Sequence, residues 1–152
     1  MSNKSKKKTK KQRIRPLAIC IFRWGDYILV SKGLDPASGE NFYRPVGGGI
    51  EFGEYAEAAL VREVQEELEK EIYDLALLGI LENLFEFDQQ AGHEIVFVYD
   101  GRFKDESLYN LEQVIRGHEG KEAFEAVWRR VEDCEIEQIP LYPAGLADLL
   151  SR

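Results

Sequence analysis

Three glutamates lie close together in this chain, at Glu63, Glu66 and Glu67. Their spacing of i, i+3 and i+4 places all three side chains on one face of an α-helix. Like charges at this spacing repel one another by roughly 0.2–0.5 kcal/mol per pair. A positively charged partner relieves that repulsion. Carboxylate oxygens are the ligands that hard divalent cations prefer, so the pattern indicates a cation site.

The apolar residues of the same predicted helix indicate where the carboxylates point. They recur at helical spacing and form one stripe, with Ala56, Leu60, Val64 and Leu68. On the helical wheel Glu67 falls between Ala56 and Leu60, so it borders the face that packs on the core. A half-buried carboxylate needs a partner. Mg²⁺ or Mn²⁺ suits this position, because both bind carboxylates and substrate phosphates together.

A glycine-rich turn, Gly47-Gly48-Gly49, precedes the predicted helix. Glycine lets the backbone approach a metal ion or a phosphate group without a Cβ in the way. The alternative is a solvent-exposed helix that is simply rich in glutamate. That alternative explains neither the three glycines nor the place of Glu67 at the edge of the apolar stripe.

The segment resembles the Nudix box, the signature motif of the Nudix hydrolase family. The box combines a glycine, a glutamate and an Arg-Glu-hydrophobic-any-Glu-Glu run at fixed spacing, and many positions of different chemistry must coincide. The matching positions are Gly48, Glu54, Arg62, Glu63, Val64, Glu66 and Glu67. Glu69 stands where the family has glycine, and Lys70 where it has an apolar residue. Both departures fall at the exit of the helix, where glycine would supply a left-handed cap.

The resemblance implies both a fold and a reaction. The fold is of the α/β class, an α/β/α sandwich with a mixed β-sheet between helices. The reaction is hydrolysis of the pyrophosphate linkage of a nucleoside diphosphate joined to another group. Nucleotide sugars, dinucleoside polyphosphates and nucleoside triphosphates are such substrates. The implied cofactor is Mg²⁺ or Mn²⁺, and the implied partner is a nucleotide-type small molecule.

The resemblance also implies roles for residues of the box. Glu63, Glu66, Glu67 and the carbonyl oxygen of Gly48 are the expected metal ligands. One of the glutamates, directly or through another ligand, positions or deprotonates the attacking water. Arg62 is expected to pair with the box carboxylates and orient them. We therefore expect Glu63, Glu66 and Arg62 to be the catalytic residues.

Further candidates lie outside the box. Glu94 begins a strand-like stretch and is our candidate for an additional carboxylate, as ligand or base; the alternative is a solvent-exposed residue at a strand edge. Arg44 precedes the glycine turn and is expected to contact phosphate. Tyr43 or its neighbour Phe42 is expected to stack on a base, and we assign Tyr43 to the substrate site. The alternative is that these rings pack in the core.

Charge divides the chain into two parts. Residues 1–15 hold eight basic residues and no acidic ones, which leaves 12 basic against 28 acidic residues in the remainder, a net charge of −16. We expect residues 1–15 to be a disordered basic tail and residues 16–152 to be one Nudix hydrolase domain. Such a tail is also typical of nucleic-acid contact. The acidic body argues against tight nucleic-acid binding by the domain itself, so that contact is not favoured.

The order of predicted elements fits a mixed α/β domain. We expect a hairpin of residues 17–23 and 27–32, a loop over 33–41, a strand over 42–46, a helix over 55–70, strands over 75–87 and 94–103 with a turn over 88–93, and a helix from Pro143 through Leu150. The stretch 121–131 fits a strand or a helix. The Nudix resemblance favours a strand around 127–131.

Composition indicates the cellular compartment of the protein. No apolar run approaches a membrane span, and no secretory signal is present, so we expect a cytoplasmic protein without a membrane partner. Cys20 and Cys134 have no metal-ligand spacing and are expected to be reduced thiols. A homodimer is possible. Two other functions remain open: a regulatory Nudix domain that senses a nucleotide, and an RNA 5′-end pyrophosphohydrolase that uses the basic tail.

Overall fold

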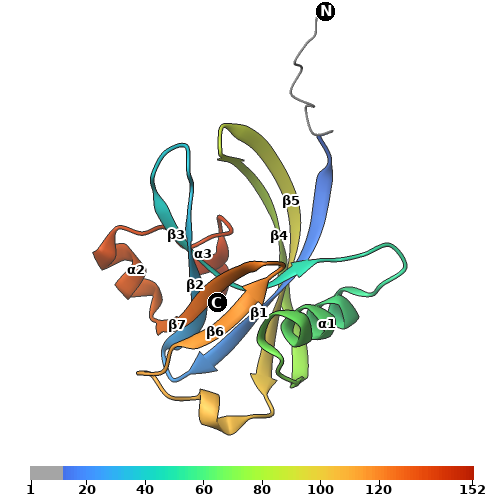
Figure 1. Cartoon of the computed structure of the whole chain (residues 1–152), viewed down its shortest axis with the longest axis vertical. Coiled ribbons are helices and arrows are strands. Elements are labelled where there is room, and N and C mark those ends of the chain that lie inside the picture. Colours follow the sequence, from blue (N-terminus) through green and yellow to red (C-terminus); the bar gives the residue numbers. More distant parts are fainter. Residues whose placement is uncertain (1–11) are drawn as a thin grey trace, which may run out of the picture.

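The computed structural model describes residues 12–152 of the chain. A seven-stranded mixed sheet has helix α1 on one face and helices α2 and α3 on the other (Figure 1). The strands are β1 (Ile14–Trp24), β2 (Tyr27–Leu34), β3 (Asn41–Gly49), β4 (Ile72–Phe87), β5 (Gln90–Phe103), β6 (Ile115–Glu119) and β7 (Glu122–Arg129). The helices are α1 (Ala56–Leu68), the 3₁₀ turn η1 (Glu106–Leu108), α2 (Val131–Glu137) and α3 (Leu146–Leu150). This architecture confirms the expected α/β/α sandwich.

The sheet has the strand order β4-β5-β1-β3-β2-β7-β6, with β1 and β5 parallel and the other pairs antiparallel. Strand β1 lies between β3 and β5, and its residues 18–22 are buried. Burial on both faces explains the continuous apolar run of this strand. Ala18 pairs with Gly48 of β3 on one side and with Phe97 of β5 on the other. Gly47, Gly48 and Gly49, which we expected to form a turn, are thus the last residues of β3, and their ladder to β1 holds them in register with β5.

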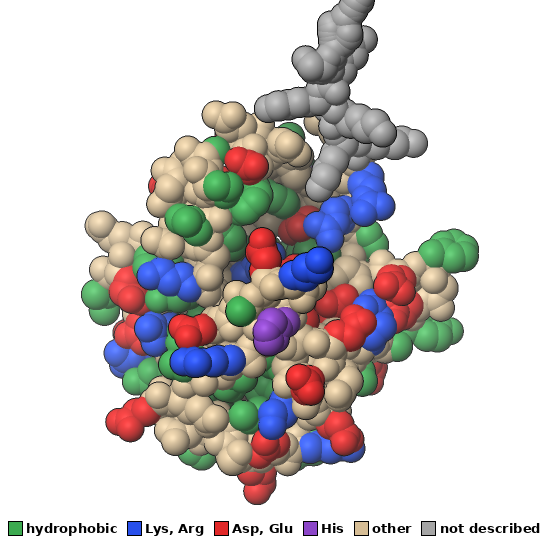
Figure 2. Space-filling model, in the orientation of Figure 1, with side chains coloured by type: hydrophobic (Ala, Val, Ile, Leu, Met, Phe, Trp, Pro, Cys, Tyr) green, Lys and Arg blue, Asp and Glu red, His purple; other side chains and the backbone are tan. Residues whose placement is uncertain are grey.

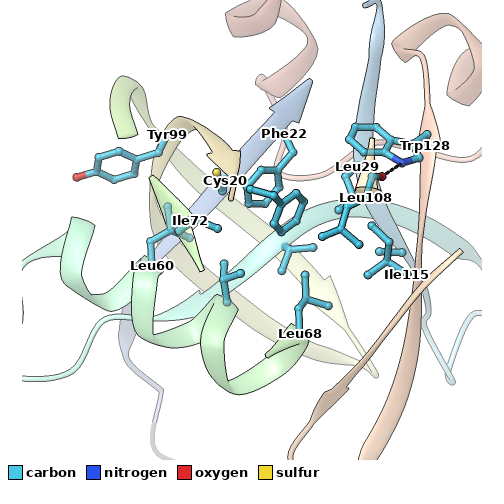
Figure 3. Packing of buried hydrophobic residues seen from close by; sticks show 14 of the residues in the cluster. Cys20, Phe22, Leu29, Leu60, Leu68, Ile72, Tyr99, Leu108, Ile115 and Trp128 are labelled. Carbon is cyan, nitrogen blue, oxygen red and sulfur yellow. Dashed lines mark hydrogen bonds between the residues drawn. The ribbon is translucent and has the colours of Figure 1, made fainter. Parts of the chain in front are cut away.

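Helix α1 is fixed on the sheet by its apolar stripe. Leu60, Val64 and Leu68 are buried in a cluster that includes Phe22 and Trp128 (Figure 3). Full burial of a leucine or valine side chain stabilises the fold by roughly 1.5–3 kcal/mol. Because this stripe faces the sheet, the rotation of α1 about its axis is determined. That rotation decides where the three glutamates of the helix lie.

A second hydrophobic cluster lies on the opposite face of the sheet. It joins Cys134 of α2 and Leu146 of α3 to sheet residues that include Val98 and Tyr43.

Both described cysteines are free and buried. Within residues 12–152, none of the helices has the length and apolar character that crossing a membrane requires.

The exit of α1 keeps a left-handed cap without glycine. Glu69, which stands where the family has glycine, has φ 57° and ψ 40°, and its N–H donates to the carbonyl of Gln65. Lys70, which replaces an apolar residue, forms an ion pair with Asp105 at 2.8 Å. The backbone thus follows the path that glycine would allow, with a residue that carries a Cβ in a conformation that is costly for it.

The β4–β5 hairpin differs from the expected turn over 88–93. Its turn has only two residues, Asp88 and Gln89, both with positive φ (51° and 63°). Strand β5 therefore begins at Gln90, and β4 begins at Ile72, before the expected start at residue 75. The prediction was wrong because the polar residues at the hairpin end are solvent-exposed and show no apolar alternation.

The C-terminal third differs more from expectation. Strand β7 ends at Arg129 and α2 follows, so a strand over 127–131 was only partly correct. Strand β6 was not predicted, because its short sequence Ile-Arg-Gly-His-Glu carries no clear hydrophobic alternation. The last helix begins at Leu146 rather than at Pro143, whose carbonyl accepts the N–H of Leu146 at 3.1 Å.

The first strand begins earlier than the expected boundary between tail and domain. Strand β1 begins at Ile14, so the domain includes two residues that we assigned to the tail. Ile14 pairs with His93 and Arg15 with Glu94 in the parallel ladder to β5. Residues 1–11 of the expected tail lie outside the described residues. Arg15 is therefore a part of the sheet.

Glu69→Gly is predicted to stabilise the protein, because glycine adopts the left-handed cap without the cost borne by a residue with a Cβ. We expect a gain of about 1 kcal/mol in the free energy of unfolding, measured by urea denaturation. Glu57→Gly, the same change at an exposed position inside α1, should destabilise the protein by roughly 0.5–1 kcal/mol. A loss of stability in Glu69→Gly would contradict the cap geometry.

Candidate functional site

A cleft of about 1350 Å³ is bordered by α1, by strands of the sheet and by the loops between them. In Figure 2, acidic, basic and hydrophobic side chains lie close together in the upper half of the molecule. The sequence-predicted residues that line the cleft are Gly48, Arg44, Glu63, Glu66, Glu67 and Glu94. The fold thus brings together six residues from three separate segments of the sequence, β3, α1 and β5.

The three glutamates of α1 lie at different depths. Glu67 is buried, with 8% of its surface exposed. The side chain of Glu63 is 17% exposed, and that of Glu66 is 56% exposed. This order agrees with the helical wheel, on which Glu67 borders the apolar stripe and Glu66 lies furthest from it. The carboxylates therefore form a row from the core to the cleft opening.

The backbone of Gly48 lies directly against the carboxyl group of Glu63. A Cβ at Gly48 would overlap the Oε2 and Cδ atoms of Glu63. At the next residue, Gly49, a Cβ would meet only an Arg15 side-chain nitrogen, at an ordinary contact distance of 3.8 Å. A Cβ at position 48 would thus force the Glu63 carboxyl group to move, and glycine avoids this. The carboxyl group of Glu63 therefore lies next to the backbone of Gly48.

Arg62 joins the end of β3 to the carboxylates of α1. Its guanidinium donates to Glu54 at 2.7 and 2.9 Å and to the carbonyl of Gly49 at 3.0 Å. It also donates to Glu63 at 2.9 Å and to Glu66 at 3.0 Å. The hydrogen bonds from Arg62 hold the pKa of Glu54 at about 2. Arg62 thus fixes the orientation of two of the three expected ligands.

The charge of Glu67 is not balanced in the same way. Within residues 12–152, the ion pairs of the cluster join Arg62 to Glu63 and Glu66 and leave Glu67 without a lysine or arginine partner. Burial first, and then the nearby charges of Glu63 and Glu119, raise the pKa of Glu67 to about 8. The charge of Arg44 opposes this rise. An ionised Glu67 therefore needs an additional positive charge.

The residues present fit the divalent cation that the resemblance implies. Within the described part of the chain, no three Asp, Glu, His or Cys side chains already converge as a closed metal site, and Arg62 engages one oxygen each of Glu63 and Glu66. The donors are nevertheless all oxygens, which Mg²⁺ and Mn²⁺ prefer. A buried carboxylate without a cationic partner and a backbone that only glycine leaves open both favour an ion at this place.

Glu94 is part of the cleft and not a solvent-exposed edge residue. Its side chain is 13% exposed and lies 3.8 Å from the guanidinium of Arg15. Asn83, a buried polar residue of β4, donates to Glu94 at 3.5 Å. His93, the preceding residue, instead contacts Glu82 at 3.0 Å and does not line the cleft. The alternation of β5 thus directs Glu94 into the cleft that the expected ligands also line.

The assignment of Tyr43 to the substrate site was wrong. Tyr43 is only 1% exposed, and its hydroxyl donates to Glu137 of α2 at 3.3 Å on the opposite face of the sheet. Its neighbours Phe42 and Arg44 line the cleft instead, because adjacent residues of a strand point to opposite faces. Arg44 is half exposed and pairs with Glu119 at 3.2 Å.

Several cleft residues were missed in the sequence. Arg15 was assigned to the tail, because its neighbours upstream are basic. Asn83 interrupts an apolar strand, and that interruption was a usable signal, since a polar residue inside a strand is commonly held by a partner. Phe87 and Tyr142 also line the cleft. They come from the end of β4 and from the loop before α3, so no local pattern relates them.

The pKa of Glu67 predicts how the stability of the metal-free protein depends on pH. Because the folded-state pKa of about 8 exceeds the ordinary value of 4.5, folding favours the protonated form. The contribution of Glu67 is present below about pH 4.5 and is lost as the pH rises toward 8. Between these values stability should fall by up to about 1.4 kcal/mol per pH unit. Glu67→Gln should remove this slope in urea denaturation with a chelator present; an unchanged slope would contradict the burial of an unpaired carboxyl.

Gly48→Ala is predicted to displace the Glu63 carboxyl group, because the new methyl group occupies its place. We expect the affinity for Mn²⁺ to fall by about 10- to 100-fold, as for other changes that disturb the support of metal ligands. Isothermal titration calorimetry measures this affinity. Gly49→Ala is the matched control and should bind Mn²⁺ as the wild type does. Equal affinities of the two variants would show that the close approach at Gly48 is irrelevant to the ion.

Solved structures share this fold at low sequence identity. A NUDIX hydrolase from Nitrosomonas europaea has a TM-score of 0.66 at 15% identity, with 91% of this chain and 87% of that chain covered. A MutT protein from Methanosarcina mazei Go1 has a TM-score of 0.57 at 19% identity, with 95% of each chain covered. An ADP compounds hydrolase has a TM-score of 0.54 at 16% identity, with 90% of this chain and 68% of that chain covered. No curated protein sequence matches the chain significantly.

The sequence itself matches the family model described as NUDIX domain over residues 13–150. This match includes the three glycines at the end of β3, α1 with its three glutamates, and β5 with Glu94. It begins one residue before strand β1 and ends with the last residue of α3. The chain therefore belongs to the Nudix hydrolase family, whose members hydrolyse anhydrides that contain phosphorus.

Proposed function

We propose that this protein uses a divalent cation to hydrolyse the pyrophosphate linkage of a nucleoside diphosphate joined to another group. The observation that carries this proposal is the buried carboxyl group of Glu67, which has no cationic partner within residues 12–152. It lies on the same face of α1 as Glu63, whose carboxyl group touches Gly48. A binding module for a neutral ligand does not need this costly arrangement.

The cation would be held by Glu63, Glu66, Glu67 and the carbonyl oxygen of Gly48, with Glu94 as a further carboxylate of the same cleft. When bound, it lowers the pKa of water and neutralises negative charge on the phosphates. Mg²⁺ and Mn²⁺ are the candidates, because the donors are oxygens. The negative charge of the cleft would otherwise repel a diphosphate.

The residues of the chain position the reacting groups. Arg62 holds the Glu63 and Glu66 carboxylates in place through the contacts described above. Arg44 and Arg15 bring positive charge into the cleft and are suited to bind phosphate oxygens. One glutamate of the cluster accepts a proton from the attacking water. We assign the catalytic role to Glu63 and Glu66, which share the Arg62 contact and lie above the buried Glu67.

Attack by water at phosphorus is the route that the residues favour. The oxygen of water bonds to one phosphorus, the bridging oxygen leaves with the other phosphate, and the proton passes to a carboxylate. Cys20 and Cys134 are buried and lie outside the residues that line the cleft. Burial raises the pKa of both thiols, which keeps them protonated and poor nucleophiles. Free, buried thiols also support a cytoplasmic location.

A second candidate is the hydrolysis of the 5′ end of RNA. One observation favours it: Arg13 and Arg15 line the cleft, and the basic segment precedes them in the sequence. The acidic residues around the cleft, which include Glu51, Glu119 and Glu122, oppose a long polyanion. A regulatory domain that only senses a nucleotide would not require the complete carboxylate set.

The formation of a homodimer remains a prediction.

Hydrolysis is predicted to require both a divalent cation and the charge of Glu67. Purified protein is incubated with a panel of nucleotides and with Mg²⁺, Mn²⁺ or a chelator, and products are identified by mass spectrometry. Glu67→Gln keeps the shape of the side chain and removes its charge, so turnover should fall by at least about 100-fold with the fold intact. Glu57→Gln, an exposed change on the same helix outside the cleft, is the control.

The outcome that would overturn the proposal is near wild-type turnover in Glu67→Gln, or turnover that persists in the chelator. Hydrolysis in oxygen-18 water adds a second criterion. Label on a phosphate product agrees with attack at phosphorus. Label on a sugar carbon contradicts it.

A further inference from the structure

The cleft contains a cluster of three aromatic rings apart from the carboxylates. Phe42 belongs to β3, Phe87 ends β4, and Tyr142 lies in the loop before α3. The ring of Phe42 lies 5.5 Å from that of Tyr142 and 6.2 Å from that of Phe87, between ring centroids. All three line the cleft. Nothing in the proposed reaction at the carboxylates uses these rings.

These rings are accessible to a ligand. Phe87 and Tyr142 are each 40% exposed, and Phe42 is half-buried. Tyr43, which follows Phe42 directly in the sequence, is only 1% exposed. The fold thus buries one ring of this pair in the core and directs the other into the cleft. Grouped aromatic surface of this kind is typical of a subsite on which a flat group stacks.

Charge indicates which part of a substrate this subsite accepts. Asp35, Glu40 and Glu86 also line the cleft. Asp35 accepts the backbone N–H groups of Ala37 and Asp88. Within residues 12–152, neither Glu40 nor Glu86 has an ion pair with lysine or arginine. Acidic residues beside aromatic rings repel phosphate and accept hydrogen bonds from amino groups, so the subsite suits a nucleobase and not a phosphate group.

Strand β3 sets the distance between the aromatic subsite and the proposed reaction site. Phe42, Arg44 and Gly48 are an even number of residues apart, so they face the same side of the strand. At about 3.4 Å per residue, Phe42 and Gly48 are about 20 Å apart along the strand. Arg44 lies between them and borders the same cleft. A flat group at Phe42 and a diphosphate at Gly48 are thus separated by a stretch that contains a cationic side chain.

The size of the cleft agrees with this separation. Its volume of about 1350 Å³ exceeds the roughly 300–1,000 Å³ of pockets that enclose one compact ligand. A mononucleotide has only a ribose between its base and its phosphates. A dinucleoside polyphosphate has a second nucleoside beyond the phosphate chain. Its chain would pass Arg44, and its second base would reach the aromatic rings.

We propose that Phe42, Phe87 and Tyr142 form a subsite for the distal base of a two-ended substrate, of the dinucleoside polyphosphate class, whose phosphate chain passes Arg44. This inference rests on the proposed function, because it places the hydrolysed linkage at the glutamates of α1. Water adds to one phosphorus and the bridging oxygen leaves with the other phosphate. Two mononucleotides result, and no further reactant is required.

The test compares diadenosine tetraphosphate with ATP as substrates of the full chain. Phe87→Ala and Tyr142→Ala should each raise the KM for diadenosine tetraphosphate by about 5- to 100-fold, which is the range expected when stacking on one base is lost. The kcat for this substrate and the kcat/KM for ATP should change less than about two-fold, because neither depends on the distal base. Phe87→Leu and Tyr142→Leu should lose stacking while they retain apolar volume, so a folding defect is distinguished from a lost subsite. Melting temperatures are measured for every variant.

Tyr73→Ala is the matched control. Tyr73 is also on β4 and is 43% exposed, but it does not line the cleft. Its substitution should leave the KM for both substrates unchanged. Equal effects of Phe87→Ala and Tyr142→Ala on the two substrates, or no effect on either, would overturn the distal-base subsite. If the wild type hydrolysed no nucleotide with either metal, the proposed function itself would fail, which is a different result.

Discussion

The crowding of carboxylates where α1 meets β3 is the constraint on which the rest of the site depends. The apolar stripe of α1 must face the sheet, and Glu67 lies at the border of that stripe, so a carboxyl group is carried into the core. Arg62 stabilises Glu63 and Glu66 but does not pair with Glu67. Burial raises the pKa of Glu67 to about 8. The metal-free fold thus contains a local destabilisation, which an added cation would remove.

Helix α1 also shows how the fold tolerates residues that are locally unfavourable. Glu69 adopts the left-handed cap conformation in place of glycine, and Lys70 forms an ion pair with Asp105 where the family has an apolar residue. These departures from the family pattern change side-chain chemistry and keep the backbone path. Stability is supplied by the two hydrophobic clusters on either face of the sheet, and the central strand β1 contributes to both. The site can therefore contain unbalanced charge without loss of the fold.

The part of the site that could be predicted is the part determined by local periodicity. The helical spacing correctly placed Glu67 at the border of the buried face of α1, because one apolar stripe decides that position. Tyr43 was assigned wrongly, since alternation in β3 allows either of two adjacent rings to face the cleft. Only the packing of α2 and α3 against the opposite face of the sheet decides between them. Arg15 was missed because its basic neighbours hid the first residues of β1. Of the aromatic cluster, only Phe42 was a candidate in the sequence. Phe87 and Tyr142 were missed because they come from distant segments of the chain.

The most direct measurement of the central claim is anomalous diffraction from crystals of the protein soaked in Mn²⁺. We expect one strong anomalous peak bonded to carboxylate oxygens of Glu67 and Glu63 and to the carbonyl oxygen of Gly48, with the Arg62 contacts retained. Crystals of Glu67→Gln should lose most of this peak under the same conditions. A wild-type structure whose ordered Mn²⁺ lies elsewhere, with Glu67 bound to no ion, would show that Glu67 is not part of a cation site.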